Sequence, residues 1–214
     1  MRHLIIALAL ALPLAAVASD NDVDKVNGDI RIDAGQSAGE LSTVNGDITL
    51  ADGASARKAD TVNGGVTLGA RATIGSVNTV NGGIELQAGA KVSGEIEAVN
   101  GHIELARGAD VSGRVSNVNG RIELDAAHVG GGVETVDGDI DIGANSRVEG
   151  GILVDKPNGG WFHHNRTPHI VIGPHAVVQG TLEFRHEVVL EVSDSAQIGA
   201  VKGATPVKFS GSQP

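Results

Sequence analysis

Val99-Asn100-Gly101-His102-Ile103-Glu104-Leu105 is the stretch that decides the fold, because the chain repeats its pattern over most of its length. The pattern Val-Asn-Gly-x-Ile/Val-x-Leu/Ile begins at Val26, Val44, Val62, Val80, Val99 and Val118, and returns as Val-Asp-Gly at Val136. Successive copies are 18 or 19 residues apart. Such a period is too short for a pair of helices, and with alternating apolar residues it indicates one turn of a β-solenoid.

Each copy contains three short apolar segments separated by turn residues. In the copy at Val99 these segments are 103–105, 109–111 and 115–118, and Gly108 and Gly113 stand between them. Alternate residues of a strand point to opposite sides, so each segment turns apolar side chains inward. We predict an all-β, single-stranded, three-sided β-solenoid (β-helix) of about 18 residues per coil and nine or ten coils, and the spacing leaves its handedness open.

Composition divides the chain into four parts. Residues 1–18 have the basic start, apolar run and small-x-small end of a signal peptide, and an acidic lead-in follows at 19–25. The solenoid is expected over 26–201 and a Gly-, Ser- and Pro-containing tail over 202–214. The apolar run is shorter than the roughly 20 residues of a membrane span. We therefore expect a periplasmic or secreted protein with no transmembrane segment after cleavage.

Charge and cysteine content exclude several classes. The 214 residues carry 16 Lys+Arg and 26 Asp+Glu, a net charge of −10, which argues against a nucleic-acid partner. With no cysteine, the chain has neither disulfides nor the thiol on which a lipoprotein is acylated.

The Asn-Gly pairs are expected to form one corner of every coil. At this corner lie Asn27, Asn45, Asn63, Asn81, Asn100 and Asn119, with Asp137 in the seventh copy. Coils stacked about 4.8 Å apart would let the amides hydrogen-bond along the rod as a structural ladder. A row of ligand-binding amides is the functional alternative. Glycine at the next position permits a positive φ.

One column of outward positions collects acidic residues. Between the apolar residues of the first segment stand Arg31, Thr49, Thr67, Glu85, Glu104, Glu123 and Asp141. A solvated face is the expected role of this column, and a surface for a cation or a basic partner is the alternative.

An insertion within 155–168 interrupts the repeat and is the candidate binding loop. It contains the only tryptophan, and the residues we single out are Trp161, Phe162, His163, His164 and Arg166. Loops that leave a solenoid often bind partners, here a metal, a glycan or a protein. Imidazoles of His163, His164 and His169 are the candidate metal ligands, although no cysteine completes the set.

No catalytic motif stands out elsewhere. The stretch Ile172-Gly173-Pro174-His175-Ala176-Val177 resembles a hexapeptide-type acyltransferase repeat, with His175 as candidate general base. That resemblance covers little more than one coil. We therefore expect no enzymatic activity, no catalytic residue and no cofactor, and keep the acyltransferase as an alternative.

The repeated Val-Asn-Gly-x-Ile-x-Leu, followed by Gly-Ala-x-Val-x-Gly, resembles the bactofilin-like, polymer-forming β-solenoid proteins and exported β-strand-repeat proteins of unknown function. The resemblance covers roughly 26–201. It implies a right-handed solenoid that associates end to end without nucleotide and has no catalytic residues. The signal peptide sets this chain apart from a cytoskeletal role. We expect an exported structural or scaffolding protein that self-associates or binds a cell-envelope protein or glycan.

Overall fold

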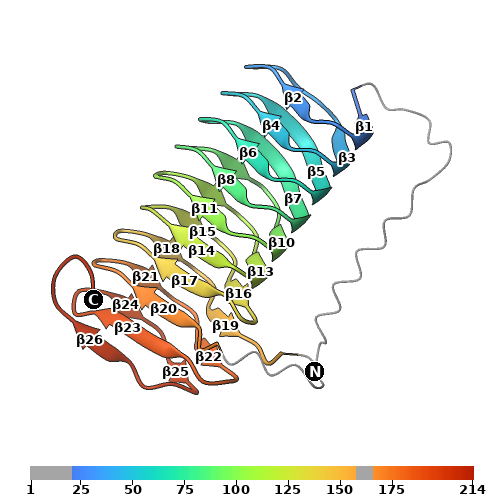
Figure 1. The fold of residues 1–214 in the computed structure, drawn as a ribbon. Coiled ribbons are helices and arrows are strands. Elements are labelled where there is room, and N and C mark those ends of the chain that lie inside the picture. The colour runs from blue at the N-terminus through green and yellow to red at the C-terminus, as the bar shows by residue number, and fades with distance from the viewer. Residues whose placement is uncertain (1–20, 158–165) are drawn as a thin grey trace.

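A computed structural model describes residues 21–157 and 166–214, and every regular element in these ranges is a β-strand. The strands stack into a straight rod of coils, with the first coil at one end and the last at the other (Figure 1). All of the paired strands are parallel, as expected when each coil lies directly on the one before. The predicted β-solenoid is thus confirmed, with ten strands in its longest unbranched sheet.

The strands occupy three faces. The first face is a ten-stranded sheet formed by β2 (Ile30–Ile32), β4 (Ile48–Leu50), β6 (Val66–Leu68), β8 (Ile84–Leu86), β11 (Ile103–Leu105), β14 (Arg121–Leu124), β17 (Asp139–Ile142), β20 (His169–Ile172), β23 (Val189–Ser193) and β26 (Val207–Phe209). The second face has the short strands β9 (Lys91–Val92), β12 (Asp110–Val111), β15 (His128–Val129), β18 (Arg147–Val148), β21 (Val177–Val178) and β24 (Gln197–Ile198).

The third face leads back to the Asn-Gly corner. It is formed by β1 (Val23–Asn27), β3 (Glu40–Asn45), β10 (Ile96–Asn100), β13 (Val115–Asn119), β16 (Val133–Thr135), β19 (Ile152–Val154), β22 (Leu182–Phe184) and β25 (Val201–Lys202). The long strands β5 (Ser55–Asn63) and β7 (Thr73–Asn81) run through the corner between the second and third faces. This continuity joins those two faces into one 16-stranded sheet.

The core is a set of apolar columns that run the length of the rod. On the first face, Ile84, Ile103 and Ile122 lie in register, and each is fully buried. The second copy fills its inward positions with smaller groups, such as the buried Ala54 and Ala59. Each coil covers the next, so burial and strand pairing both depend on stacking.

The valine of Val-Asn-Gly does not belong to this core, contrary to the expectation that segment 115–118 turns both of its valines inward. Along β13, Val115 and Asn117 are buried, whereas Val118 is only half-buried. Strand alternation explains the difference, since residues two apart share a side and Val118 is three residues from Val115. Three other coils have a buried threonine at the inward position two residues before the asparagine, namely Thr43, Thr61 and Thr79.

Glycine at the Asn-Gly corner is required mainly by the close approach of the neighbouring coil. A Cβ on Gly101 would lie 1.8 Å from the carbonyl oxygen of Gly82, and one on Gly64 would lie 1.9 Å from that of Gly46. Positive φ angles are found at Gly28 and Gly120, but not at Gly64 or Gly101, so backbone conformation is the reason only in some coils.

The solenoid extends beyond the predicted 26–201 at both ends. Strand β1 begins at Val23, within the expected acidic lead-in, and β26 lies within the expected tail and pairs with β23. The insertion lies where the repeat predicts it, between the end of β19 at Val154 and the start of β20 at His169.

Candidate functional site

The Asn-Gly corner carries a continuous chain of side-chain amides, which we call the asparagine ladder. Its members are Asn27, Asn45, Asn63, Asn81, Asn100 and Asn119, and from Asn45 onward each Nδ2 donates to the Oδ1 of the asparagine one coil earlier, at 2.9–3.1 Å. The chain has a direction, because each of these five bonds gives its N–H toward the N-terminal end of the rod. An amide has both a donor and an acceptor, so one residue type can continue the ladder indefinitely.

Threonine hydroxyls support the same corner from inside. Thr43, Thr61 and Thr79 each donate from Oγ1 to the carbonyl of a corner glycine in the preceding coil, at 2.9–3.2 Å. Asn117 takes this inward position in a later coil and donates to the carbonyl of Gly101 at 3.4 Å. The threonines were missed in the sequence, although Thr-Val-Asn-Gly recurs in three consecutive copies.

The ladder ends where residue 137 is aspartate. Asp137 keeps its backbone bond, donating its N–H to the carbonyl of Val118 at 2.9 Å. An ionised carboxylate has no N–H, so it cannot donate to Oδ1 of Asn119 as another asparagine would. The corner changes with it: Gly138 donates its N–H to Oγ1 of Thr135 at 2.9 Å, and Thr135 donates to Oδ1 of Asn117 at 2.7 Å.

The inserted loop leaves from this corner in the very next coil, and ion pairs hold its two ends. Of the candidate binding residues, Trp161, Phe162, His163 and His164 lie outside the described residues. Arg166 is described and pairs with Asp139 of β17.

The second oxygen of Asp139 accepts the backbone N–H of His169 at 3.0 Å, so one carboxylate fixes the returning chain. On the leaving side, Asp155 accepts a hydrogen bond from Arg185 at 3.1 Å.

A histidine bridges the coils on either side of the insertion. His186, in the corner that follows β22, bonds through Nε2 to the carbonyl of Val136 at 2.8 Å. Since that carbonyl oxygen can only accept, the ring nitrogen is the donor. His186 and Val136 are 50 residues apart in the sequence. The hydrogen bond thus connects the corners on either side of the one at which the loop is inserted.

The other candidate histidines do not converge. His169 bonds through Nε2 to Glu191, one coil further on, at 2.5 Å. His175 is an exposed corner residue with φ of 57°, and its backbone N–H donates to Ser195. Over residues 21–157 and 166–214, no three His, Cys, Asp or Glu side chains are grouped as metal ligands, and His163 and His164 lie outside these ranges.

The acidic column forms as predicted on the first face. Glu85, Glu104, Glu123 and Asp141 follow one another in register. Burial raises the pKa of Asp141, and the charge of Glu123 raises it further, against the opposing effects of Arg121 and His169. Arg121 lies 4.0 Å from Glu123, and His102 lies 3.7 Å from Glu85. These basic neighbours partly offset the repulsion along the column.

The second face carries a column of mixed charge, a feature that the repeat alone did not reveal. Its members Lys91, Asp110, His128 and Arg147 are successive partners, and Nδ1 of His128 is 2.6 Å from Asp110. The His128–Asp110 contact lets these two neighbouring coils attract each other through their side chains.

On the third face one arginine collects three acids. Arg114 donates to Glu95, Glu97 and Glu134 at 3.0–3.2 Å. Burial alone would lower the pKa of Arg114, but the three carboxylates outweigh it and raise that pKa. The cluster ties three coils together.

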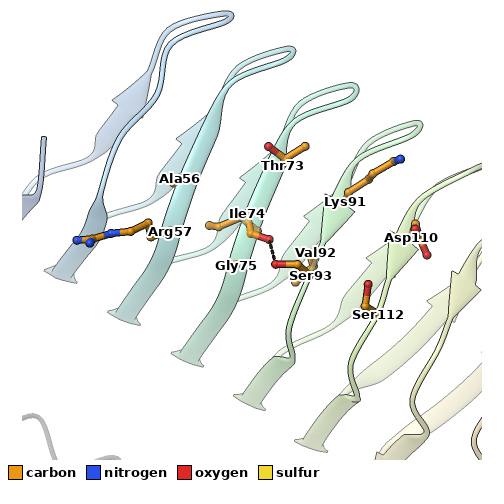
Figure 2. Close-up of a pocket in the computed structure, with 10 residues that line it drawn as sticks. All are labelled: Ala56, Arg57, Thr73, Ile74, Gly75, Lys91, Val92, Ser93, Asp110 and Ser112. Atoms are coloured by element: carbon orange, nitrogen blue, oxygen red, sulfur yellow. Dashed lines mark hydrogen bonds between the residues drawn. The ribbon is translucent and has the colours of Figure 1, made fainter.

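An open groove of about 520 Å³ lies along the second face, across β5, β7, β9 and β12 (Figure 2). Its polar lining includes Arg57, Thr73, Lys91, Ser93, Asp110 and Ser112, and the Ser93 hydroxyl donates to the carbonyl of Ile74 at 3.4 Å. Among the described residues, this lining contains no histidine that could act as a base for a hydroxyl and no cysteine that could act as a nucleophile. The groove offers hydroxyl and charge contacts without a catalytic arrangement.

Fold and corner together define the class of protein: a three-sided parallel β-solenoid repeat. No family model, curated protein or solved structure matches this chain. The resemblance to bactofilin-like proteins therefore stays a prediction. In the described part of the chain, no helix has the length and apolar character needed to cross a membrane.

Proposed function

We propose that this protein is a non-enzymatic structural scaffold that is exported and associates end to end with a second copy. The observation that supports it most is the open edge of the first coil. Among the described residues, strands β1 and β2 pair on one side only, with β3 and β4, and an edge of this kind is a template for further strand pairing. Export rests on the signal-peptide features of residues 1–18.

The first coil presents the surface that coils elsewhere use for stacking. Val26 is 60% exposed, since the described residues hold no coil before it, whereas its counterparts Val44 and Val62 are half-buried. Oδ1 of Asn27 accepts from Asn45, and among the described residues its Nδ2 has no acceptor. One backbone carbonyl at this edge, that of Asp29, accepts Nζ of Lys25 at 2.5 Å.

The last coil is less suited to stacking. In β26, the exposed Lys208 stands opposite the fully buried Val192, so a charged residue ends the register of a core column. A charged residue on an edge strand is a common protection of sheet edges. Association through the first coil alone would join two rods and would not continue into a filament.

Sedimentation velocity over a range of concentrations tests this proposal. Wild-type protein should convert from one rod to a pair, and Val26→Lys should remain a single rod because it places a charge on the stacking surface. Thr67→Lys, which adds the same charge on the side of the rod, and Val207→Lys at the last coil are the matched controls and should still pair. A strictly single wild-type rod would contradict the association, and filaments would contradict the restriction to one end.

A binding module that uses residues 157–169 is the second candidate. The supporting observation is that both ends of this loop are held by the folded coils, through Arg166 on Asp139 and Asp155 on Arg185. An insertion whose described ends are fixed in this way can bind a partner without disturbing the core.

Trp161 is the only tryptophan, so its fluorescence reports on this loop alone. Titration with Zn²⁺, with envelope glycan fragments and with purified envelope proteins should change the emission if the loop binds. For a metal, His163→Ala/His164→Ala should abolish the change. Deletion of 157–167 should abolish binding measured by calorimetry while the circular dichroism stays that of the intact fold. Unchanged binding after the deletion would discard this function.

A further inference from the structure

The corner glycines donate their backbone N–H groups in all but one coil of the asparagine ladder. Gly28, Gly46, Gly64, Gly82 and Gly101 each donate to the backbone carbonyl of the asparagine in the next coil, at 2.8–3.1 Å. These nitrogens are the atoms that could attack the side chain of the asparagine before them, since an Asn-Gly pair can close a five-membered succinimide ring. The hydrogen bonds engage the nucleophile and hold it in the corner.

Asn119-Gly120 lacks this protection. Among the described residues, the N–H of Gly120 has no hydrogen-bond acceptor. The next coil differs from the earlier ones at this corner, because its strand β16 already ends at Thr135 and the N–H of Gly138 donates to Oγ1 of Thr135. The Oδ1 of Asn119 also receives no amide, since aspartate stands at position 137. Only the Nδ2 of Asn119 is engaged, on Asn100 at 2.9 Å.

Asn27, at the opposite end, gives an internal comparison. It too is a terminal member of the ladder with a single side-chain hydrogen bond, from Asn45 at 2.9 Å. Its glycine differs, because Gly28 donates its N–H to the carbonyl of Asn45 at 2.8 Å. Asn27 is moreover exposed, whereas Asn119 is half-buried, so exposure alone would rank the two sites in the opposite order.

We propose that Asn119 is the site in the asparagine ladder where this protein deamidates. The backbone nitrogen of Gly120 loses its proton and attacks Cγ of Asn119, so that an N–C bond forms, the Cγ–Nδ2 bond breaks and ammonia leaves with the proton. Water then adds to either carbonyl of the succinimide and opens the ring to aspartate or iso-aspartate. No oxidant, reductant or metal is required.

The products shorten the ladder by one member. Aspartate at 119 has no N–H to donate to Asn100, so Asn100 becomes the new end, just as Asp137 now makes Asn119 the end. Iso-aspartate also adds a methylene to the backbone at a corner where the coils approach closely: a Cβ on Gly120 would already lie 2.2 Å from the carbonyl oxygen of Gly101. The change would loosen the last corner of the ladder, two coils before the inserted loop.

Peptide mapping of the wild-type full chain measures this directly. Folded protein is aged at mildly alkaline pH, digested with trypsin and analysed by mass spectrometry for conversion of amide to acid. Trypsin places each ladder asparagine on its own peptide, and these peptides are 26–31, 32–57, 59–71, 72–91, 92–107 and 115–121. Fragment ions separate Asn119 from Asn117 within 115–121. Asn158-Gly159, outside the described residues, is read on a different peptide and does not enter the comparison.

The same ageing in urea is the matched control, since all six sites share the local sequence Val-Asn-Gly. In the folded protein Asn119 should convert roughly tenfold faster than the other five, the effect of one hydrogen bond that need not be broken. In urea the six rates should become similar. Equal rates in the folded protein, a faster rate at Asn27, or the same lead of Asn119 in urea would each overturn the proposal.

Discussion

The coils up to β13 and those from β16 onward share a core but differ at the Asn-Gly corner. In the first group an uninterrupted amide ladder and three threonine hydroxyls connect every corner to the one before. In the second group the insertion after β19 interrupts one corner, and Asp139, Arg166 and His186 connect the coils on either side of it. The apolar columns continue through both groups, as Ile122, Ile140 and Ile170 show by their register and complete burial.

The difference indicates which part of a coil must be repeated. The core columns depend on inward side chains alone, so they survive an insertion at a corner. The ladder depends on the same residue in every coil, and a single aspartate stops it. After the aspartate, ion pairs and one histidine connect the coils in place of the amide hydrogen bonds of the ladder. The side chains of arginine and histidine are longer than that of asparagine.

Loss of a core leucine should have the largest effect and should be alike in both groups. Leu105→Ala and Leu182→Ala each remove a fully buried side chain, so each should lower the free energy of unfolding by about 2–5 kcal/mol. Urea denaturation followed by circular dichroism measures this loss. A much smaller loss at Leu182 would mean that the coils after the insertion are not packed onto the same core.

An amide inside the ladder should matter more than the amide at its end. Asn63→Ala removes two side-chain hydrogen bonds and should cost about 1–3 kcal/mol, whereas Asn119→Ala removes one and should cost about half as much. The same denaturation experiment compares them. Equal costs at the two positions would show that the ladder bonds do not contribute separately.

The histidine bridge should be worth about as much as one threonine bond in the other group. His186→Ala removes the bond to the carbonyl of Val136, and Thr79→Ala removes the bond to the carbonyl of Gly64. Each should lower the free energy of unfolding by about 0.5–1.5 kcal/mol. If thermal unfolding of His186→Ala matched wild type while Thr79→Ala was destabilised, the bridge would not compensate for the interrupted ladder.

The smallest effect should be a pH dependence at Asp141, near the junction of the two groups. Because its pKa is raised in the folded protein, the native state binds the proton more tightly than the unfolded chain. Stability from this group is therefore present at low pH and lost as pH rises above the ordinary range of an aspartate through the folded pKa. Asp141→Asn should remove that slope and stabilise the neutral-pH protein by less than about 1 kcal/mol. A stability curve with unchanged slope would exclude this role.

Period and alternation sufficed to predict the coil, its three segments and the corner that forms the ladder. They failed at Val118, because the repeated Val-Asn-Gly drew attention to a valine that alternation places outside the core. The inward Thr79 was overlooked for the same reason, since a polar residue did not fit an apolar pattern.

The sequence did not predict contacts between coils where the two residues occupy different positions in the repeat. Arg166 meets Asp139 across 27 positions and His186 meets Val136 across 50, and neither spacing is a multiple of the coil length. Only the path of the chain around the insertion brings these pairs together. The residues expected to bind at Trp161 to His164 stay a prediction, since they lie outside the described ranges.

Solvent exchange of the asparagine side-chain amides, followed by NMR, tests most directly the claim that one directed ladder runs along this corner and stops at Asn119. Slow exchange of one Nδ2 proton is predicted for Asn45, Asn63, Asn81, Asn100 and Asn119, and fast exchange for Asn27, whose Nδ2 has no acceptor among the described residues. Fast exchange at all six asparagines would contradict the ladder.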